Sequence, residues 1–169
     1  MGQCGIKTGS GYDVHKLVEG RKLIIGGVDI EFHKGLDGHS DADVLVHAVC
    51  DAILGALGAG DIGDHFPDTD PQYKGISSLV LLEHCKDLLE AKHYQIINMD
   101  CIVFAQAPKI SPYKAQMKEN MARVLNIDSS LVNVKATTTE RLGFIGKEEG
   151  IAAQCTLLVN SVFPGQSSG

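Results

Sequence analysis

Asp13 and His15 are the residues whose types and spacing most directly suggest chemistry. They stand two positions apart, so on a β-strand both side chains leave the same face. His47 lies on a segment with helical periodicity and can supply a third ligand. One carboxylate and two imidazoles can hold zinc while leaving a coordination position open for chemistry. Spacing alone favours ordinary polar surface residues. Asp51, one helical turn after His47, slightly strengthens the metal hypothesis because it can orient the imidazole.

Three further segments carry groups suited to a phosphorylated ligand. Residues 60–71 are rich in Asp, Gly and Pro, which indicates either turns or recognition of hydroxyls or a cation. Residues 105–111 have small side chains, so their backbone can bind a flat heterocycle with Lys109 near a phosphate, although a plain strand-to-helix connection is commoner. Residues 137–140 place three hydroxyls beside a carboxylate, which suits a phosphate with a bridging cation. The alternative is that residues 137–140 are only the end of a β-strand, because threonine favours strands.

Bulk properties exclude several classes of function. The chain has 169 residues, which fits one domain, and we expect flexible ends at about 1–5 and 163–169. A net charge of -6 argues against a general nucleic-acid binder. No apolar run is long enough to span a membrane, and no signal peptide is recognisable. The five cysteines form no C-x-x-C pair, which indicates buried thiols in a reducing compartment. The usual nucleotide-binding and serine-hydrolase motifs are absent.

Periodicity predicts strands interleaved with helices, and therefore an α+β or α/β sandwich with helices on one face of a sheet. Ser40 is expected to start the first helix, with Asp43 in a capping-box position. Residues 22–25 and 28–32 are expected to pair as a hairpin around Gly26 and Gly27. The other expected strands are 6–15, 96–105, 132–136 and 151–159, the helices are 40–57, 77–93 and 111–125, and the loops are 33–38, 60–71 and a glycine-bounded hairpin loop at 143–150.

The motifs in order are much more specific than any one alone. They read G-Y-D-V-H, I-I-G-G-V, G-H-S-D-A-D-V-L-V-H, D-I-G-D-H-F-P-D-T-D-P, A-Q-A-P-K, V-N-V-K-A-T-T-T-E-R-L-G-F and E-E-G-I-A-A. From about residue 9 to residue 159, this closely resembles the 2-C-methyl-D-erythritol 2,4-cyclodiphosphate synthase family of the non-mevalonate isoprenoid pathway. The resemblance implies one α+β domain with a mixed sheet covered by helices on one face, in a ferredoxin-like or chorismate-mutase-like arrangement. It also implies a homotrimer with active sites between subunits.

The resemblance further implies cyclisation of 4-diphosphocytidyl-2-C-methyl-D-erythritol 2-phosphate with release of CMP, so the small-molecule substrate is a cytidine diphosphate. It assigns Zn²⁺ to Asp13, His15 and His47, and Mg²⁺ or Mn²⁺ to Glu140 with the substrate phosphates. His39 and Thr138 are the implied catalytic residues. The implied substrate contacts are Asp13, Val14, His15, His39, Ser40, Asp61, Ile62, Gly63, Phe66, Pro67, Asp68, Thr69, Asp70, Ala105, Gln106, Ala107, Pro108, Lys109, Ile110, Ser111, Thr137, Thr138, Thr139, Glu140, Phe144 and Lys147.

Two departures from bacterial members stand out. Residues 7–10 read K-T-G-S where Arg-Ile-Gly-His is usual, and Lys147 replaces an arginine that faces a central trimer cavity able to hold an isoprenoid diphosphate. Lysine keeps the charge but loses the bidentate fork. We expect an enzyme of the bacterial cytoplasm, or of the plastid stroma after transit-peptide removal. The alternatives are another zinc-dependent phosphoryl-transfer enzyme or phosphate-ester hydrolase on the same scaffold, and a metal-stabilised module that only binds isoprenoid diphosphates.

Overall fold

The computed structural model describes residues 5–67 and 69–162. Expectations for Cys4, Asp68 and most of the two chain ends therefore lie outside the described residues. The strands are β1 (Ile6–Glu19), β2 (Leu23–Ile25), β3 (Val28–Ile30), β4 (Lys34–Leu36), β5 (Tyr94–Phe104), β6 (Val132–Thr137) and β7 (Gly150–Ser161). The helices are α1 (Val44–Leu57), α2 (Ile62–His65), α3 (Ser78–Ala91), α4 (Lys114–Leu125) and α5 (Gly143–Gly146), with short 3-10 turns at Pro71–Tyr73, Ser111–Tyr113 and Ser129–Leu131.

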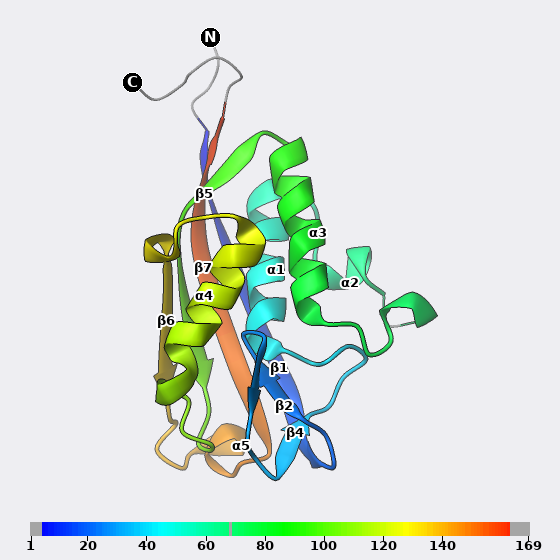
Figure 1. Cartoon of the computed structure of the whole chain (residues 1–169), viewed down its shortest axis with the longest axis vertical. Helices are drawn as coiled ribbons and strands as arrows, with labels where there is room; N and C mark the ends of the chain where they lie inside the picture. The colour runs from blue at the N-terminus through cyan, green and yellow to red at the C-terminus, as the bar shows by residue number, and fades with distance from the viewer. Residues whose placement is uncertain (1–4, 68, 163–169) are drawn as a thin grey trace.

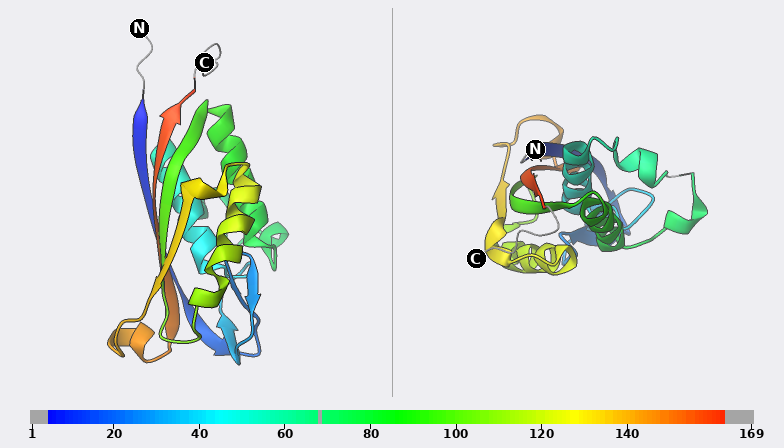
Figure 2. Two further views of the ribbon diagram at one scale, coloured as in Figure 1. Left: turned by 60° about the vertical axis from the view of Figure 1, so that its left-hand side comes forward. Right: turned by 90° about the horizontal axis from the view of Figure 1, so that it is seen from above.

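The main sheet is mixed, as expected. Its strand order is β4-β1-β7-β5-β6, and only the β5–β6 pair is parallel (Figure 1). The expected hairpin around Gly26 and Gly27 is confirmed as the separate β2–β3 pair. Figure 2 shows α1, α3 and α4 on one side of the sheet. The α+β class with helices on one face is therefore confirmed.

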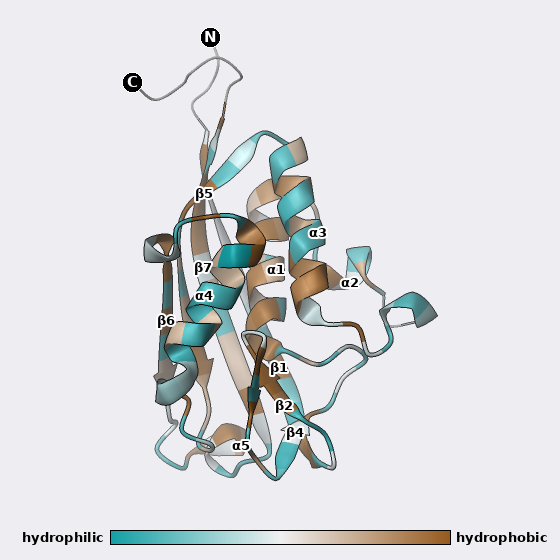
Figure 3. Cartoon of the chain, in the orientation of Figure 1, coloured by the Kyte–Doolittle hydropathy of each residue, from teal (hydrophilic) through white to brown (hydrophobic). Residues whose placement is uncertain are grey.

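Helix α1 forms the centre of the hydrophobic core. Every residue of this helix is buried except His47, Asp51 and Gly55. It packs between β1 and α3. Figure 3 shows that α1 is largely hydrophobic, whereas α3 and α4 have polar outer faces. The core thus fixes the axis of α1 and leaves His47 at its edge, close to the sheet.

The start of α1 differs from the expectation. Asp43, not Ser40, is the N-cap, and its side chain accepts a hydrogen bond from the Val46 amide at 3.1 Å. The fully buried carboxylate also accepts from the Gly26 amide at 2.9 Å and the Gly27 amide at 2.6 Å. A capping box starting at Ser40 was wrong because Asp43 serves two partners at once: the helix and the distant β2–β3 turn.

Several connections expected to be irregular are ordered. Residues 34–36 form β4, which pairs with β1, and β1 extends to Glu19 rather than ending at His15. Residues 62–65 form α2 inside the expected 60–71 loop. The segment 143–150 is no hairpin loop: it contains α5, and its flanking strands β6 and β7 are separated by β5. The errors in the strands share one cause, because strand partners distant in the sequence leave no local signal.

Four cysteines behave as the sequence predicts. Cys50, Cys85, Cys101 and Cys155 are buried free thiols in the core. Burial raises the pKa of the Cys50 thiol well above its usual value. Within residues 5–67 and 69–162, no helix has both the length and the apolar character needed to cross a membrane.

Candidate functional site

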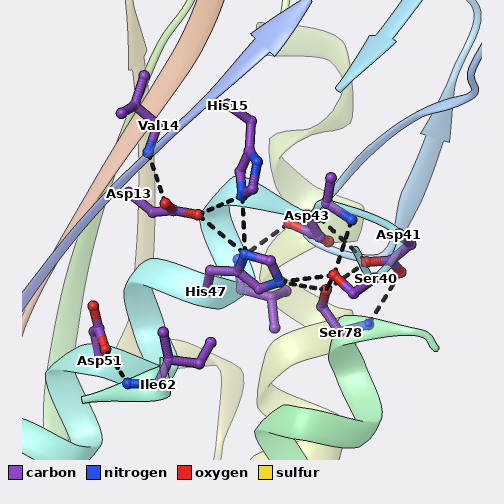
Figure 4. Close-up of polar contacts among 12 residues, drawn as sticks. Asp13, Val14, His15, Ser40, Asp41, Asp43, His47, Asp51, Ile62 and Ser78 are labelled. Atoms are coloured by element: carbon purple, nitrogen blue, oxygen red, sulfur yellow. Dashed lines mark hydrogen bonds and ion pairs between the residues drawn. The ribbon is translucent and has the colours of Figure 1, made fainter. Parts of the chain in front are cut away.

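The expected metal group assembles where β1 meets α1. Side chains on β1 point alternately toward the helices and away from them. Those of residues 9, 11, 13, 15 and 17 point toward the helices, so Asp13 and His15 share the covered face. His47 reaches them from α1 (Figure 4). Asp13 Oδ2 lies 2.9 Å from His15 Nε2 and 3.0 Å from His47 Nδ1, and the two imidazole nitrogens are 3.1 Å apart. These three side chains form a group that can hold a metal ion.

The electrostatics of this group suit a cation. Burial acts to raise the pKa of Asp13, but hydrogen bonds and charge from His15 and His47 outweigh it and hold the pKa well below its usual value. Burial likewise acts to lower the pKa of His15, but the Asp13 carboxylate outweighs it and raises the pKa. The second ring nitrogen of His15, Nδ1, lies 2.7 Å from the Asp37 carbonyl oxygen, which fixes the orientation of the ring.

Asp51 does not orient His47. Its Oδ1 accepts a hydrogen bond from the Ile62 amide at 2.8 Å, so Asp51 holds the start of α2 instead. Burial raises the pKa of Asp51, although the hydrogen bond from Ile62 acts to lower it. The second nitrogen of His47, Nε2, instead lies 3.1 Å from Ser40 Oγ and 2.9 Å from Ser78 Oγ. The expected partner was wrong because α1 presents Asp51 toward α2 rather than toward the metal group.

A pocket of about 600 Å³ opens beside the three ligands. His39 and Ser40 line it, with His39 Nε2 3.3 Å from the Asp70 carbonyl oxygen. The expected contacts Ile62, Gly63, Phe66, Pro67 and Thr69 also line this pocket. The Asp61 carboxylate caps α2, and that of Asp70 caps the following 3-10 turn. These two carboxylates thus accept hydrogen bonds from nearby backbone amides, which is the usual role of Asp in turns.

A second pocket, of about 250 Å³, lies at the other edge of the sheet. It is formed by Ala105, Gln106, Ala107, Pro108, Lys109, Ile110 and Ser111 together with Ala136, Thr137 and Thr138. Two hydrogen bonds join the segments: the Ala105 amide to the Thr137 carbonyl at 3.0 Å, and the Arg141 amide to Gln106 Oε1 at 3.0 Å. Thr138 Oγ1 donates to Glu140 Oε1 at 2.6 Å. The structure therefore joins two segments that are distant in the sequence.

The two pockets are separate within one chain. Val14 pairs with Ala152, Ala152 with Phe104, and Phe104 with Thr137. Val14 and Thr137 therefore lie on one line perpendicular to the strands. Three strand spacings separate them, which is roughly 14 Å. The metal group and the Thr137–Glu140 segment are therefore not brought together in a single chain.

Phe144 and Lys147 line neither of these two pockets. Phe144 is exposed on α5 and, with Val14, His15, Lys16, Glu149 and Gly150, lines a further surface hollow, which shares His15 with the metal pocket. Lys147 is the exposed C-cap residue of α5 and is not among the residues lining that hollow.

Sequence reasoning missed several residues that line the metal pocket or support it. Arg21 donates to the carbonyl oxygens of Gly38 and Ser40, both at 3.0 Å, and so fixes the segment that carries His39. Ser78 supports His47, and Tyr73 and Leu81 line the pocket. A lone arginine in a loop and a serine at a helix start carry no distinguishing sequence signal.

The fold and this site define a small α+β protein with an open centre of three potential metal ligands at the helix-covered face of its sheet. The chain belongs to the YgbB family, whose model matches residues 6–160. It is 60% identical over 154 residues to a 2-C-methyl-D-erythritol 2,4-cyclodiphosphate synthase of Geotalea uraniireducens (strain Rf4), covering 91% of this chain and 98% of that relative. A relative of the same name from Geobacillus thermodenitrificans (strain NG80-2) is 60% identical over 153 residues, covering 90% of this chain and 96% of that protein.

Solved structures show the same fold. A Plasmodium falciparum IspF in complex with CDP superimposes with a TM-score of 0.83 at 38% identity, covering 96% of this chain and 100% of that chain. The bifunctional IspDF of Campylobacter jejuni gives a TM-score of 0.91 at 45% identity, covering 95% of this chain. This chain spans 43% of that bifunctional protein.

Proposed function

We propose that this chain cyclises 4-diphosphocytidyl-2-C-methyl-D-erythritol 2-phosphate to 2-C-methyl-D-erythritol 2,4-cyclodiphosphate and releases CMP. The observation that carries the proposal is the group of Asp13, His15 and His47 opening into the 600 Å³ pocket, in a chain of the YgbB family. Relatives at about 60% identity carry the name of this synthase. The proposal makes the chain a phosphorus–oxygen lyase.

The three ligand atoms fit zinc. Donors held at about 2.0–2.1 Å in a tetrahedron lie roughly 3.3 Å from one another. The observed separations of 2.9, 3.0 and 3.1 Å are within a few tenths of an ångström of that value. Zinc held by Asp13, His15 and His47 would supply a Lewis acid for the phosphate oxygens. Glu140, exposed and beside Thr138, is the proposed ligand of a second divalent ion, Mg²⁺ or Mn²⁺.

The protein's own residues then have positioning and electrostatic roles. The attacking group is the substrate's 2-phosphate, which is already anionic, so no protein nucleophile or strong general base is needed. His39 and Ser40 face the pocket and contact the reacting phosphates, and Thr138 stabilises charge on the phosphate next to cytidine. Folding the substrate so that its ends meet is worth about 7–11 kcal/mol in well-oriented intramolecular reactions.

The second pocket is the proposed cytidine site. Residues 105–111 offer backbone donors and acceptors between small side chains, and this backbone can bind the pyrimidine ring. Lys109 is exposed at the rim, where its charge favours a diphosphate. The methylerythritol unit would lie near the 61–70 segment of the metal pocket.

We propose a homotrimer with active sites between subunits, because within one chain the strand positions Val14, beside the metal group, and Thr137, in the second pocket, are roughly 14 Å apart across the sheet. Joining the metal pocket of one subunit to the cytidine pocket of its neighbour would complete the site. The exposed side of the sheet offers a surface for this assembly, with Tyr12 at 55% and Val14 at 43% exposure. Phe144 and Lys147 near this face are the proposed contacts of an isoprenoid diphosphate in a central cavity.

The reaction is tested by phosphorus NMR of the product formed by purified protein with substrate, Zn²⁺ and Mg²⁺. We expect a cyclic diphosphate and CMP. A linear phosphate product would favour the alternative hydrolase. Ligand binding with no turnover would favour the binding module.

The shared site is tested by mixing two impaired variants and comparing the mixture with each variant alone. His47→Ala removes the metal half and Thr138→Ala weakens the cytidine half, so co-refolded mixtures should regain part of the cyclisation activity in sites that combine two intact halves. His47→Ala mixed with Asp13→Ala is the matched control and should regain none, because both changes affect the same half. Equal activity in the two mixtures would refute an intersubunit site.

A further inference from the structure

The segment between β6 and α5, which carries Thr138 and Glu140, contains a turn with an uncommon backbone. The Leu142 amide donates to the Thr139 carbonyl oxygen at 2.9 Å, which closes a four-residue turn. Both central residues have positive φ, 52° at Glu140 and 64° at Arg141. This is the pattern of a type I′ turn, which favours asparagine and glycine at these two positions. Glutamate and arginine seldom adopt positive φ, so the local sequence does not by itself favour this turn.

A side chain from another segment holds the centre of the turn. Gln106, which follows β5, accepts a hydrogen bond at Oε1 from the Arg141 amide at 3.0 Å. A backbone amide can only donate, so the side-chain atom that faces it is the carbonyl oxygen and not the amide nitrogen of Gln106. Gln106 is half-buried in the wall of the second pocket. The hydrogen bond therefore joins the pocket wall to a turn that is 35 positions away in the sequence.

The end of the turn is supported by α5. A β-carbon at Gly146 would lie 2.5 Å from Arg141 Cα and 2.7 Å from the Arg141 carbonyl oxygen, so the backbone of the turn packs directly on this glycine. The Gly146 amide donates to the Leu142 carbonyl oxygen at 3.1 Å, and Thr139 Oγ1 donates to the same oxygen at 2.8 Å. These contacts fix the end of the turn, whereas Gln106 fixes its centre.

The turn sets the directions of two proposed functional side chains. Glu140 is one of its central residues, and its side-chain direction depends on the left-handed backbone at that position. Thr138 directly precedes the turn, and its Oγ1 donates to Glu140 Oε1 at 2.6 Å. Both belong to the part of the proposed site that binds phosphates and a second ion. A loosened turn would therefore weaken contacts to phosphates more than contacts to the nucleoside.

We propose that Gln106 is a positioning residue whose side chain holds the Thr139–Leu142 turn and so orients Thr138 and Glu140 toward a diphosphate. The proposal rests on the proposed function, which assigns phosphates and a second ion to these two residues. The family resemblance implies that Gln106 contacts the substrate, whereas its side-chain oxygen has a partner within the protein. The effect of this side chain is accordingly expected on the diphosphate and not on the nucleoside.

The first test measures amide hydrogen exchange by NMR in the ligand-free full chain. Gln106→Ala should speed exchange of the Arg141 amide by about 2–10-fold, which corresponds to the net contribution of one hydrogen bond. Gln106→Glu keeps an acceptor oxygen on a side chain of the same length and should retain the protection. Gln95→Ala makes the same truncation at the exposed far end of β5, and this matched control should leave the exchange unchanged.

The second test compares binding of CDP with Mg²⁺ and binding of cytidine alone, both by NMR titration. Gln106→Ala should weaken CDP binding by about 2–10-fold and leave cytidine binding unchanged. On an Arg141→Gly background the same change should cost less CDP affinity, because glycine adopts positive φ without strain. Gln95→Ala should alter neither affinity.

Unchanged exchange of the Arg141 amide in Gln106→Ala would overturn the proposal. Equal losses of CDP and cytidine affinity would also overturn it, because they would indicate direct contact with the nucleoside. So would an undiminished loss of CDP affinity on the Arg141→Gly background. A wild-type protein that binds neither CDP nor cytidine would instead contradict the proposed function, and the exchange measurement, which needs no ligand, would still decide whether Gln106 holds the turn. Urea unfolding of each variant checks that the fold is retained.

Discussion

The geometry of the metal centre depends on a glycine that lets α1 approach β1 closely. A β-carbon at Gly11 would lie 2.0 Å from the carbonyl oxygen of Ala48 and 2.8 Å from the backbone nitrogen of Ala52. Ordinary contact begins at 3.4 Å, so Gly11→Ala requires a local separation of about 1.4 Å. Neither group is the end of a flexible side chain, so the helix or the strand must move.

This movement would act directly on the metal ligands. Gly11 stands two residues before Asp13 on the covered face of β1, and Ala48 follows His47 on α1. Asp13 Oδ2 and His47 Nδ1 are 3.0 Å apart, and metal–ligand distances tolerate changes of only about 0.2 Å. We therefore expect Gly11→Ala to weaken zinc binding at least about tenfold, or ~1.4 kcal/mol. Overpacking should also lower the free energy of unfolding by about 1–3 kcal/mol.

The assay is zinc competition with a chromophoric chelator, together with urea unfolding of the metal-free protein. Gly55→Ala is the matched control, because an added β-carbon there meets only the Ser10 carbonyl oxygen at 3.8 Å. In the interior of α1 this change should raise the free energy of unfolding by about 0.5–1 kcal/mol and leave zinc affinity unchanged. Wild-type zinc affinity in Gly11→Ala would refute the argument that close helix–strand packing sets the ligand geometry.

Two further predictions concern a proposed metal ligand and a buried carboxylate. Glu140→Gln should lower turnover more than zinc content, because Glu140 is at the other edge of the sheet from the Asp13 group. Steady-state kinetics and metal analysis measure the two effects. Equal losses of turnover and zinc would contradict a separate second ion. Burial raises the pKa of Asp43 to about 6, against hydrogen bonds from Gly27 and Val46, so its contribution to stability falls as pH rises from about 4 through about 6. The stability cost of Asp43→Asn should therefore be larger near pH ~4 than near pH ~7 in urea unfolding of the metal-free protein, and a constant cost would contradict the raised pKa.

Local periodicity determined much of this molecule. The alternation of β1 placed Asp13 and His15 on one face, and the apolar pattern of α1 identified the buried helix that carries His47. Such patterns are readable because each depends on only a few neighbouring residues. The order of motifs indicated the family, and the family model and relatives confirm it.

Tertiary structure decided how those side chains are held. Asp43 caps α1 and binds the distant β2–β3 turn, Asp51 serves α2 rather than His47, and Ser78 from α3 supports the imidazole instead. The strand order also placed the Asp13 group and the Thr137 segment at separate positions across one sheet. The sequence by itself determined that Asp13, His15 and His47 form the group that can hold a metal ion. Only the fold decided their partners, because hydrogen bonds between distant segments depend on how helices and strands pack and leave no local pattern.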